Sequence, residues 1–133
     1  MYSGFLLKIG DEKFNLKYIK EKTYTAYASV QDLDSYRDAN GELRRFPLPH
    51  VPIKVEFETK PLSGEQYEEI MAMMRRNYIN TLERKLSITA FLPEYNDYIT
   101  QNAYLVEPQP KVNVVKDNTD VQYDSLRIAF VGY

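Results

Sequence analysis

Residues 51–58 alternate between apolar and polar side chains. The apolar positions are Val51, Ile53, Val55 and Phe57. Alternation with a period of two predicts a strand with one face on a core and the other in water. Pro52 has no backbone N–H for a β-ladder, so it marks either a sheet edge or the end of the strand.

Residues 64–80 carry apolar side chains at helical spacing instead. The stripe, including its flanking residue, is Leu62, Tyr67, Ile70, Met71, Met74 and Tyr78. Ser63 and Gln66 have the spacing of a capping box, which satisfies backbone N–H groups at a helix start. We predict an amphipathic helix from about Gly64 to Asn80 that packs on a sheet face containing some of residues 53, 55 and 57.

Several further runs have the composition of strands. They lie at 5–9, 14–16, 23–31, 86–92, 98–106, 112–115 and 126–131. Pro93, Pro108 and Pro110 separate the later ones. We therefore expect a single domain over 1–133 that is mainly β with one helix (β+α). The expected architecture is an antiparallel split barrel or two-sheet β structure, with the helix packed on it and a projecting β-hairpin.

That hairpin is predicted by Asn40-Gly41, the preferred central pair of a two-residue type I′ turn. The flanking residues are mostly charged, which favours an arm over about 32–48 that reaches away from the body. A two-residue turn places Arg37 opposite Arg44, and like charges at that distance repel. It also places Tyr36 opposite Arg45, where a cation–π contact can form.

A carboxylate-bearing neighbour would relieve the repulsion between the two arginines, because guanidinium groups bind carboxylates well. The candidate subunit-interface residues are Tyr36, Arg37, Asp38, Asn40, Gly41, Arg44 and Arg45. We expect salt-sensitive self-association through the arm, with Glu56 and Glu58 as possible carboxylates on the neighbour. The alternative is an exposed hairpin whose arginines extend into solvent.

Composition changes this picture mainly by exclusion. The 133 residues include no cysteine, which excludes disulfides and thiolate zinc sites. The net charge of −2 gives no basic footprint, so we expect no direct sequence-specific nucleic-acid binding. No apolar run approaches membrane-spanning length, so we expect no membrane insertion, and the start does not resemble a signal peptide.

Catalytic equipment is sparse, and we expect neither an enzyme nor a cofactor. His50 is the single histidine and lies between prolines, which favours a structural role. Glu56 and Glu58 share a strand face, about 7 Å apart by strand rise, so a small glycoside hydrolase is one alternative. Alternating acids on a strand more often form a solvated face.

Two binding alternatives also have local signals. The oxygen-bearing residues Asp32, Asp34, Asp38 and Asn40 do not fit the spacing of a calcium-binding EF-hand loop. The chain has twelve tyrosines and no tryptophan, so a carbohydrate-binding β module is a further alternative. Tyr95, Tyr98 and Tyr104 would form its sugar-stacking surface, against the simpler interpretation of cross-strand packing.

The segments Tyr2-Ser3-Gly4-Phe5-Leu6-Leu7-Lys8 and 31–41 resemble a family of small uncharacterised proteins of phage and prophage tail modules. The order of strands, arm, one helix and further strands is also similar to the split-barrel fold of tail-tube and distal tail (baseplate hub) proteins. Distal tail proteins often carry a second, C-terminal domain, for which this chain has no residues after Tyr133.

This resemblance implies a structural subunit of a phage or prophage tail, either a distal tail or baseplate hub protein or a tube-like ring protein. It implies assembly into a ring homo-oligomer, a hexamer by resemblance, together with other tail proteins. The location implied is the host cytoplasm during assembly and the virion tail afterwards. A tail terminator or connector stays open at this point.

Overall fold

The computed structural model describes residues 1–116 and 120–133. The strands are β1 Leu7–Ile9, β2 Glu12–Lys13, β3 Thr25–Ala28, β4 Tyr36–Arg37, β5 Leu43–Arg44, β6 Ile53–Glu58, β7 Lys85–Leu92, β8 Asp97–Leu105, β9 Val112–Lys116, β10 Asp120–Tyr123 and β11 Arg127–Gly132. The helices are α1 Gly64–Asn77 and two 3-10 turns, Leu16–Tyr18 and Glu21–Thr23.

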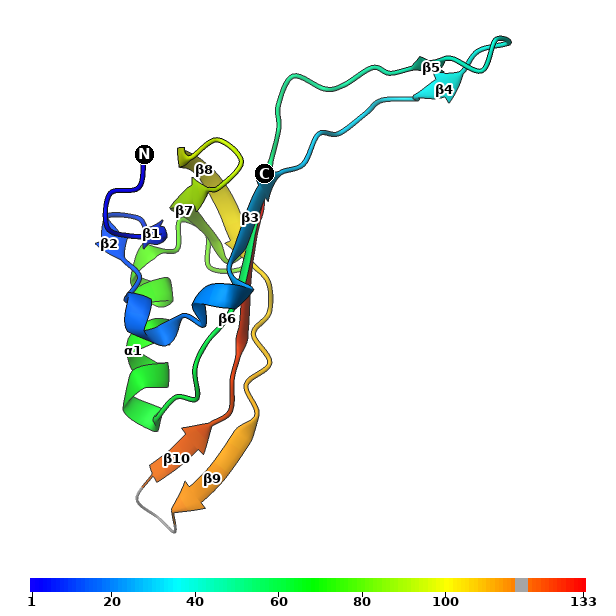
Figure 1. The fold of residues 1–133 in the computed structure, drawn as a ribbon. Coiled ribbons are helices and arrows are strands. Elements are labelled where there is room, and N and C mark those ends of the chain that lie inside the picture. Colours follow the sequence, from blue (N-terminus) through cyan, green and yellow to red (C-terminus); the bar gives the residue numbers. More distant parts are fainter. Residues whose placement is uncertain (117–119) are drawn as a thin grey trace.

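Seven strands form one antiparallel sheet in the order β2-β1-β7-β8-β11-β6-β3, and β9–β10 and β4–β5 form two separate ribbons (Figure 1). The sheet curls, and this brings β3, which lies at one edge, into contact with β7. The Tyr24 hydroxyl bridges this approach, 2.8 Å from the carbonyl oxygen of Phe91 and 3.1 Å from that of Leu6. Within the described residues no ladder closes a barrel. The mainly β class with one helix is confirmed.

Strand β6 has the alternation that its sequence predicts. Ile53, Val55 and Phe57 are fully buried, while the intervening side chains are exposed. The strand lies between β11 and β3, so it is not an edge. Pro52 therefore marks the strand end, where its carbonyl oxygen accepts a hydrogen bond from Ser29 N.

Helix α1 begins at its predicted cap. The Ser63 hydroxyl accepts from Gln66 N at 3.2 Å, and the Gln66 side chain accepts from Ser63 N at 3.0 Å. The helix ends at Asn77 rather than Asn80, because Ile79 N donates to Lys85 O in the turn that leads into β7.

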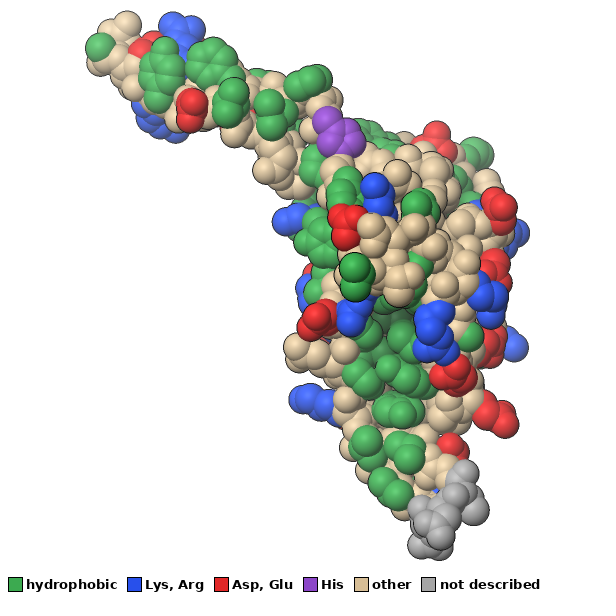
Figure 2. Space-filling view, turned by 180° about the vertical axis from the view of Figure 1, so that it is seen from behind, with side chains coloured by type: hydrophobic (Ala, Val, Ile, Leu, Met, Phe, Trp, Pro, Cys, Tyr) green, Lys and Arg blue, Asp and Glu red, His purple; other side chains and the backbone are tan. Residues whose placement is uncertain are grey.

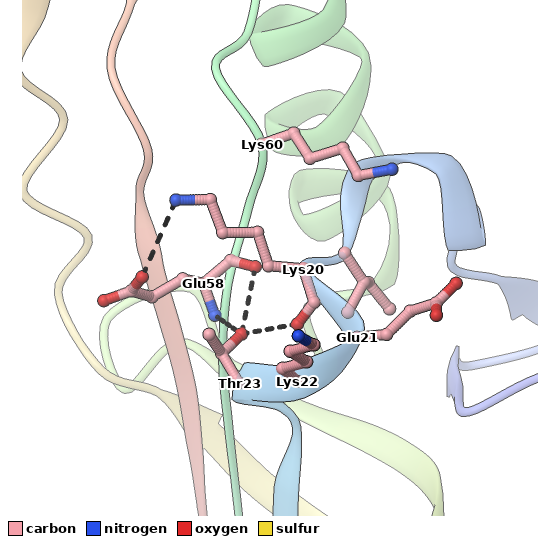
Figure 3. A pocket seen from close by; sticks show the side chains of 7 residues that line it. Lys20, Glu21, Lys22, Thr23, Glu58 and Lys60 are labelled. Carbon is pink, nitrogen blue, oxygen red and sulfur yellow. Dashed lines mark hydrogen bonds and ion pairs between the residues drawn. The ribbon is translucent and has the colours of Figure 1, made fainter.

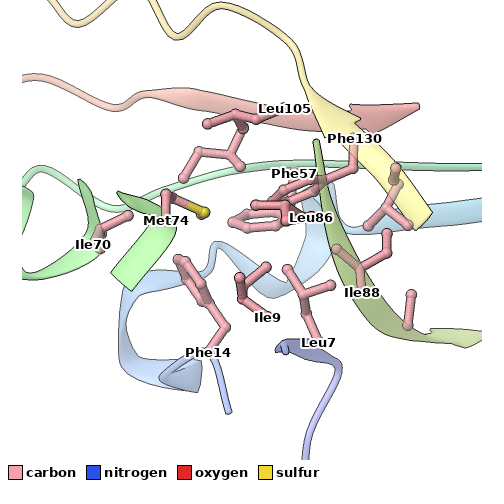
Figure 4. Close-up of a cluster of buried hydrophobic side chains, with 14 of the residues drawn as sticks. Leu7, Ile9, Phe14, Phe57, Ile70, Met74, Leu86, Ile88, Leu105 and Phe130 are labelled. Atoms are coloured by element: carbon pink, nitrogen blue, oxygen red, sulfur yellow. The ribbon is translucent and has the colours of Figure 1, made fainter. Parts of the chain in front are cut away.

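The helix buries the predicted stripe on the sheet. Ile70, Met71, Met73 and Met74 are buried in one cluster with Ile53, Val55 and Phe57. Figure 4 shows Met74 pointing toward Phe57 in this cluster. Met73 was not part of the predicted stripe, and Tyr67 is only partly buried.

Several strand boundaries differ from the sequence prediction. The expected strand at 14–16 is wrong: the Asn15 side chain accepts from Lys17 N at 3.0 Å and begins a 3-10 turn there. The expected strand at 23–31 is shorter, because 21–23 form the second 3-10 turn and the chain beyond Ala28 enters the arm. Strand β10 was not predicted.

Candidate interaction site on the projecting arm

The segment 29–52, here called the arm, connects β3 to β6 and projects far from the body (Figure 1). Backbone hydrogen bonds hold its two limbs together well below the tip. Leu48 N donates to Gln31 O at 2.7 Å, and Leu33 N donates to Phe46 O at 2.9 Å. The arm therefore continues the β3–β6 pairing outward and includes the predicted range of 32–48.

The tip of the arm is a three-residue loop, so the predicted two-residue type I′ turn is wrong. Asp38 N donates to Glu42 O and Gly41 N donates to Asp38 O, both at 2.9 Å. Gly41 has φ +80°, but Asn40 is not among the residues with positive φ. The Asp38 carboxylate accepts from Asn40 N and Glu42 N at 3.0 Å each, which stabilises this longer loop.

The longer loop shifts the register by one residue. Arg37 lies opposite Leu43, and Tyr36 lies opposite Arg44, so the predicted Arg37–Arg44 pair does not exist. Arg44 Nε donates to Asp38 at 3.1 Å, while Arg37 donates to the Gly41 carbonyl oxygen at 3.0 Å. The repulsion that called for an acidic neighbour is therefore absent.

Arg45 is also neutralised within the arm. It donates from Nε and Nη2 to the two carboxylate oxygens of Asp32, at 3.1 and 3.2 Å. The predicted contact between Tyr36 and Arg45 is wrong, because the Tyr36 ring lies instead beside Phe46, with centroids 6.2 Å apart.

The arm has an apolar character that was not predicted from the sequence. Leu33, Tyr36 and Phe46 are each more than half exposed, at 58%, 54% and 51%. The other large apolar residues of the arm that are exposed are Val30, Leu43 and Leu48. Figure 2 shows hydrophobic side chains along much of the arm, away from the core. The sequence already contained the signal, since these apolar residues lie in the segment that was predicted to project. An arm that is remote from the core cannot bury them by itself.

The base of the arm is tied to the end of the chain. His50 Nε2 makes a close contact with the main-chain oxygen of Tyr133. The Tyr133 hydroxyl donates to Glu83 at 3.1 Å, and the Lys85 ammonium lies 4.7 Å from the centre of the Tyr133 ring. His50 therefore has a structural contact at the arm base, in agreement with the structural interpretation of this histidine.

The two carboxylates of the hydrolase alternative are paired with cations of their own chain. Arg127 Nε donates to Glu56 at 2.6 Å, and this hydrogen bond lowers the pKa of Glu56. Lys20 Nζ lies 3.9 Å from Glu58. A general acid needs a raised pKa, so the arrangement does not support glycoside hydrolysis. Because both glutamates already have a cation of their own chain as a partner, they have less to offer the arginines of a neighbouring arm.

Figure 3 shows the hollow beside Glu58, which is lined mainly by lysine and glutamate side chains. Thr23 Oγ1 accepts from Glu58 N at 2.9 Å and donates to Lys20 O at 2.6 Å, so these groups join the 3-10 turn to β6.

Across residues 1–116 and 120–133, no cluster of three or more His, Asp or Glu side chains could hold a metal ion. In the same residues, no helix is both long and apolar enough to cross a membrane.

Two of the three tyrosines of the carbohydrate alternative pack on aromatic rings of their own chain. Tyr98 stacks on Phe5 with ring centroids 4.4 Å apart and donates its hydroxyl to Phe5 O at 2.7 Å. Tyr104 meets the Tyr133 ring edge-on, and Tyr95 is exposed beyond the end of β7. The contacts of Tyr98 and Tyr104 agree with the simpler interpretation, in which these rings pack within the sheet.

Chains of two solved particles have a fold similar to that of this chain. The chain is similar to one in the "Tail of empty GTA particle computed with helical refinement, C6 symmetry", with TM-score 0.52 and 10% identity. It is similar to one in the "Virion of native gene transfer agent (GTA) particle", with TM-score 0.52 and 11% identity. Each likeness covers 100% of this chain and 95% of the other.

Sequence comparison assigns the family. A family model described as "Family of unknown function (DUF6711)" matches residues 1–133, and the chain belongs to that family. No curated protein matches the chain by sequence.

Proposed function

We propose that this protein is a structural subunit of a phage or prophage tail, and that it works by self-assembly without catalysis. The observation that carries the proposal is the arm, which projects from the body and exposes Leu33, Tyr36 and Phe46. Exposed apolar patches of this kind mark protein–protein contacts. The full-length fold likeness to chains of a gene transfer agent tail and virion supports the same function.

The finer proposal is a distal tail or baseplate hub protein, or a tube-like ring protein, assembled as a hexamer with other tail proteins. Support comes from the C6 symmetry of the similar tail. We further propose assembly in the host cytoplasm and incorporation into the virion tail.

The structure changes how the arm is proposed to bind. Arg44 and Arg45 are already paired with Asp38 and Asp32, so a further contact with carboxylates of a neighbour adds little binding free energy. Burial of the exposed apolar side chains against a neighbour stabilises the contact more, by about 25 cal/mol for each Å² of apolar surface removed from water. Among the predicted interface residues, Tyr36 keeps its proposed role in contact, whereas Asp38, Asn40 and Gly41 shape the loop.

Light scattering from micromolar to millimolar concentration, followed by negative-stain imaging, tests the proposal. We expect the wild type to form oligomers or join tail assemblies, and Leu33→Ser combined with Phe46→Ser to weaken both. Leu82→Ser is the matched control, because Leu82 is 98% exposed on the body. A wild type that stays monomeric at millimolar concentration and joins no tail assembly would contradict the proposed function.

A further inference from the structure

A second exposed apolar surface lies at the end of the molecule opposite the arm. It is the β9–β10 ribbon, at the lower end of Figure 1. Every residue of β9 is exposed, and its valines are Val112, Val114 and Val115. Figure 2 shows hydrophobic side chains along this tapering end as well. Valines in a strand normally pack on a second layer, and within the described residues none covers β9.

The ribbon is held firmly on the body. Leu62 and Tyr123 exchange two backbone hydrogen bonds, at 3.0 and 2.7 Å. The Tyr67 and Tyr123 rings lie 4.4 Å apart, and a Cβ at Gly64 would come within 2.5 Å of Asp120 Oδ1. A preformed strand binds a partner with little loss of conformational entropy.

Strand β9 also has an unused edge. It pairs with β10 on one side, and no described strand lies on the other. Such an edge offers backbone N–H and C=O groups to a strand of another molecule. The arm is itself a two-stranded segment with open edges, so its backbone suits this kind of contact.

Charge at the two surfaces is complementary. Lys111 directly precedes β9, and no described carboxylate lies within ion-pair distance of its ammonium group. On the arm, Asp34 has no cation at ion-pair distance among the described residues, whereas Glu42 is 68% exposed but already lies 3.6 Å from Arg44 Nη2. A lysine beside the valines therefore matches the Asp34 carboxylate beside the apolar arm residues.

We propose that the arm of one copy binds the exposed face and free edge of β9 on a second copy. This inference rests on the proposed function, because it names the receptor for the arm in self-assembly. The arm and the ribbon lie at opposite ends of the molecule, so the arm cannot contact β9 of its own chain. The contact is heterologous, and repeated contacts of that kind close into rings or continue as filaments.

Disulfide trapping tests this contact cleanly, because the chain has no native cysteine. Leu43→Cys labels the arm and Val114→Cys labels β9, and each variant is mixed with the other and oxidised at an assembling concentration. We expect a cross-linked dimer in the mixture and none from either variant alone. Leu82→Cys, mixed with each variant, is the control for random collision.

A chain carrying both cysteines separates head-to-tail assembly from a closed pair. We expect a ladder of cross-linked species beyond the dimer, whereas a product that stops at the dimer would overturn the heterologous contact. Assembly of the double-cysteine chain without any arm-to-β9 cross-link would overturn the inference and leave the proposed function intact. Absence of assembly in the wild type would instead contradict the proposed function.

A polar isostere provides a second readout without oxidation. Val112→Thr combined with Val114→Thr keeps the shape and strand preference of β9 while removing apolar surface. We expect the concentration needed for assembly to rise about tenfold. An unchanged assembly concentration, with the fold intact by circular dichroism, would overturn the proposed receptor.

Discussion

Arg44 donates from Nε to the Asp38 carboxylate at 3.1 Å, within the tip of the same arm. The other Asp38 oxygen accepts the backbone N–H groups of Asn40 and Glu42. One carboxylate therefore shapes the loop and neutralises an arginine. The arm consequently offers a neighbour its apolar residues more than its charges.

Neutralising the arginines should weaken assembly less than removing apolar side chains. We expect Arg37→Gln with Arg44→Gln to retain most assembly, whereas Leu33→Ser with Phe46→Ser loses most of it. Raising salt from 0.1 to 1 M shortens the Debye length from about 10 to about 3 Å and should have a modest effect. Light scattering measures both, and collapse of assembly in 1 M salt would show that charge dominates.

The loop at the arm tip should depend on Gly41. Its φ of +80° is strained for a β-branched residue, so Gly41→Val should destabilise the loop by about 1–2 kcal/mol. Amide hydrogen exchange at Glu42 and Asp38 reports this locally, because the loop lies far from the core. Gly41→Asn is the control, since asparagine tolerates positive φ, and equal protection in both variants would refute the strain argument.

The helix should depend on Ile70, which is 1% exposed between α1 and the sheet. Ile70→Ala should lower the free energy of unfolding by about 2–5 kcal/mol, measured by urea denaturation. Glu65→Ala, on the exposed side of the first helical turn, should cost less than about 1 kcal/mol. A loss below about 0.5 kcal/mol for Ile70→Ala would mean that this face is not core.

The Glu56–Arg127 pair should contribute to the acid dependence of stability. The hydrogen bond from Arg127 lowers the pKa of Glu56 in the folded protein, so the unfolded chain binds its proton more readily. The contribution is present above the unfolded pKa, about 4.3, and is lost as the pH falls through the lower folded value.

Arg127→Gln should therefore lose less stability than the wild type when the pH is lowered from about 5 to 3. Urea denaturation at each pH measures the difference, and Lys54→Gln, on the same outer face, controls for loss of a positive charge. Equal pH dependence for Arg127→Gln and the wild type would show that the pair adds nothing.

Local patterns could predict much of this fold. The alternation in β6 and the Ser63–Gln66 capping box depend on neighbours within a few residues, and both were predicted. The helix end was not, because Ile79 N bonds to Lys85 O across a turn. The register of the arm was wrong because two-residue and three-residue loops are both compatible with Asn40-Gly41, and side-chain bonds from Asp38 decide between them.

The sequence by itself determined the mainly β class, the capped helix and an arm beyond the core, because hydrophobic period, capping and turn chemistry act over short distances. Only the tertiary structure decided which apolar residues stay exposed. Val112–Val115 resemble a buried strand in sequence, and Leu33 and Phe46 resemble ordinary loop residues. Burial depends on whether another layer of the chain reaches a residue, and none of the described residues covers the arm or β9.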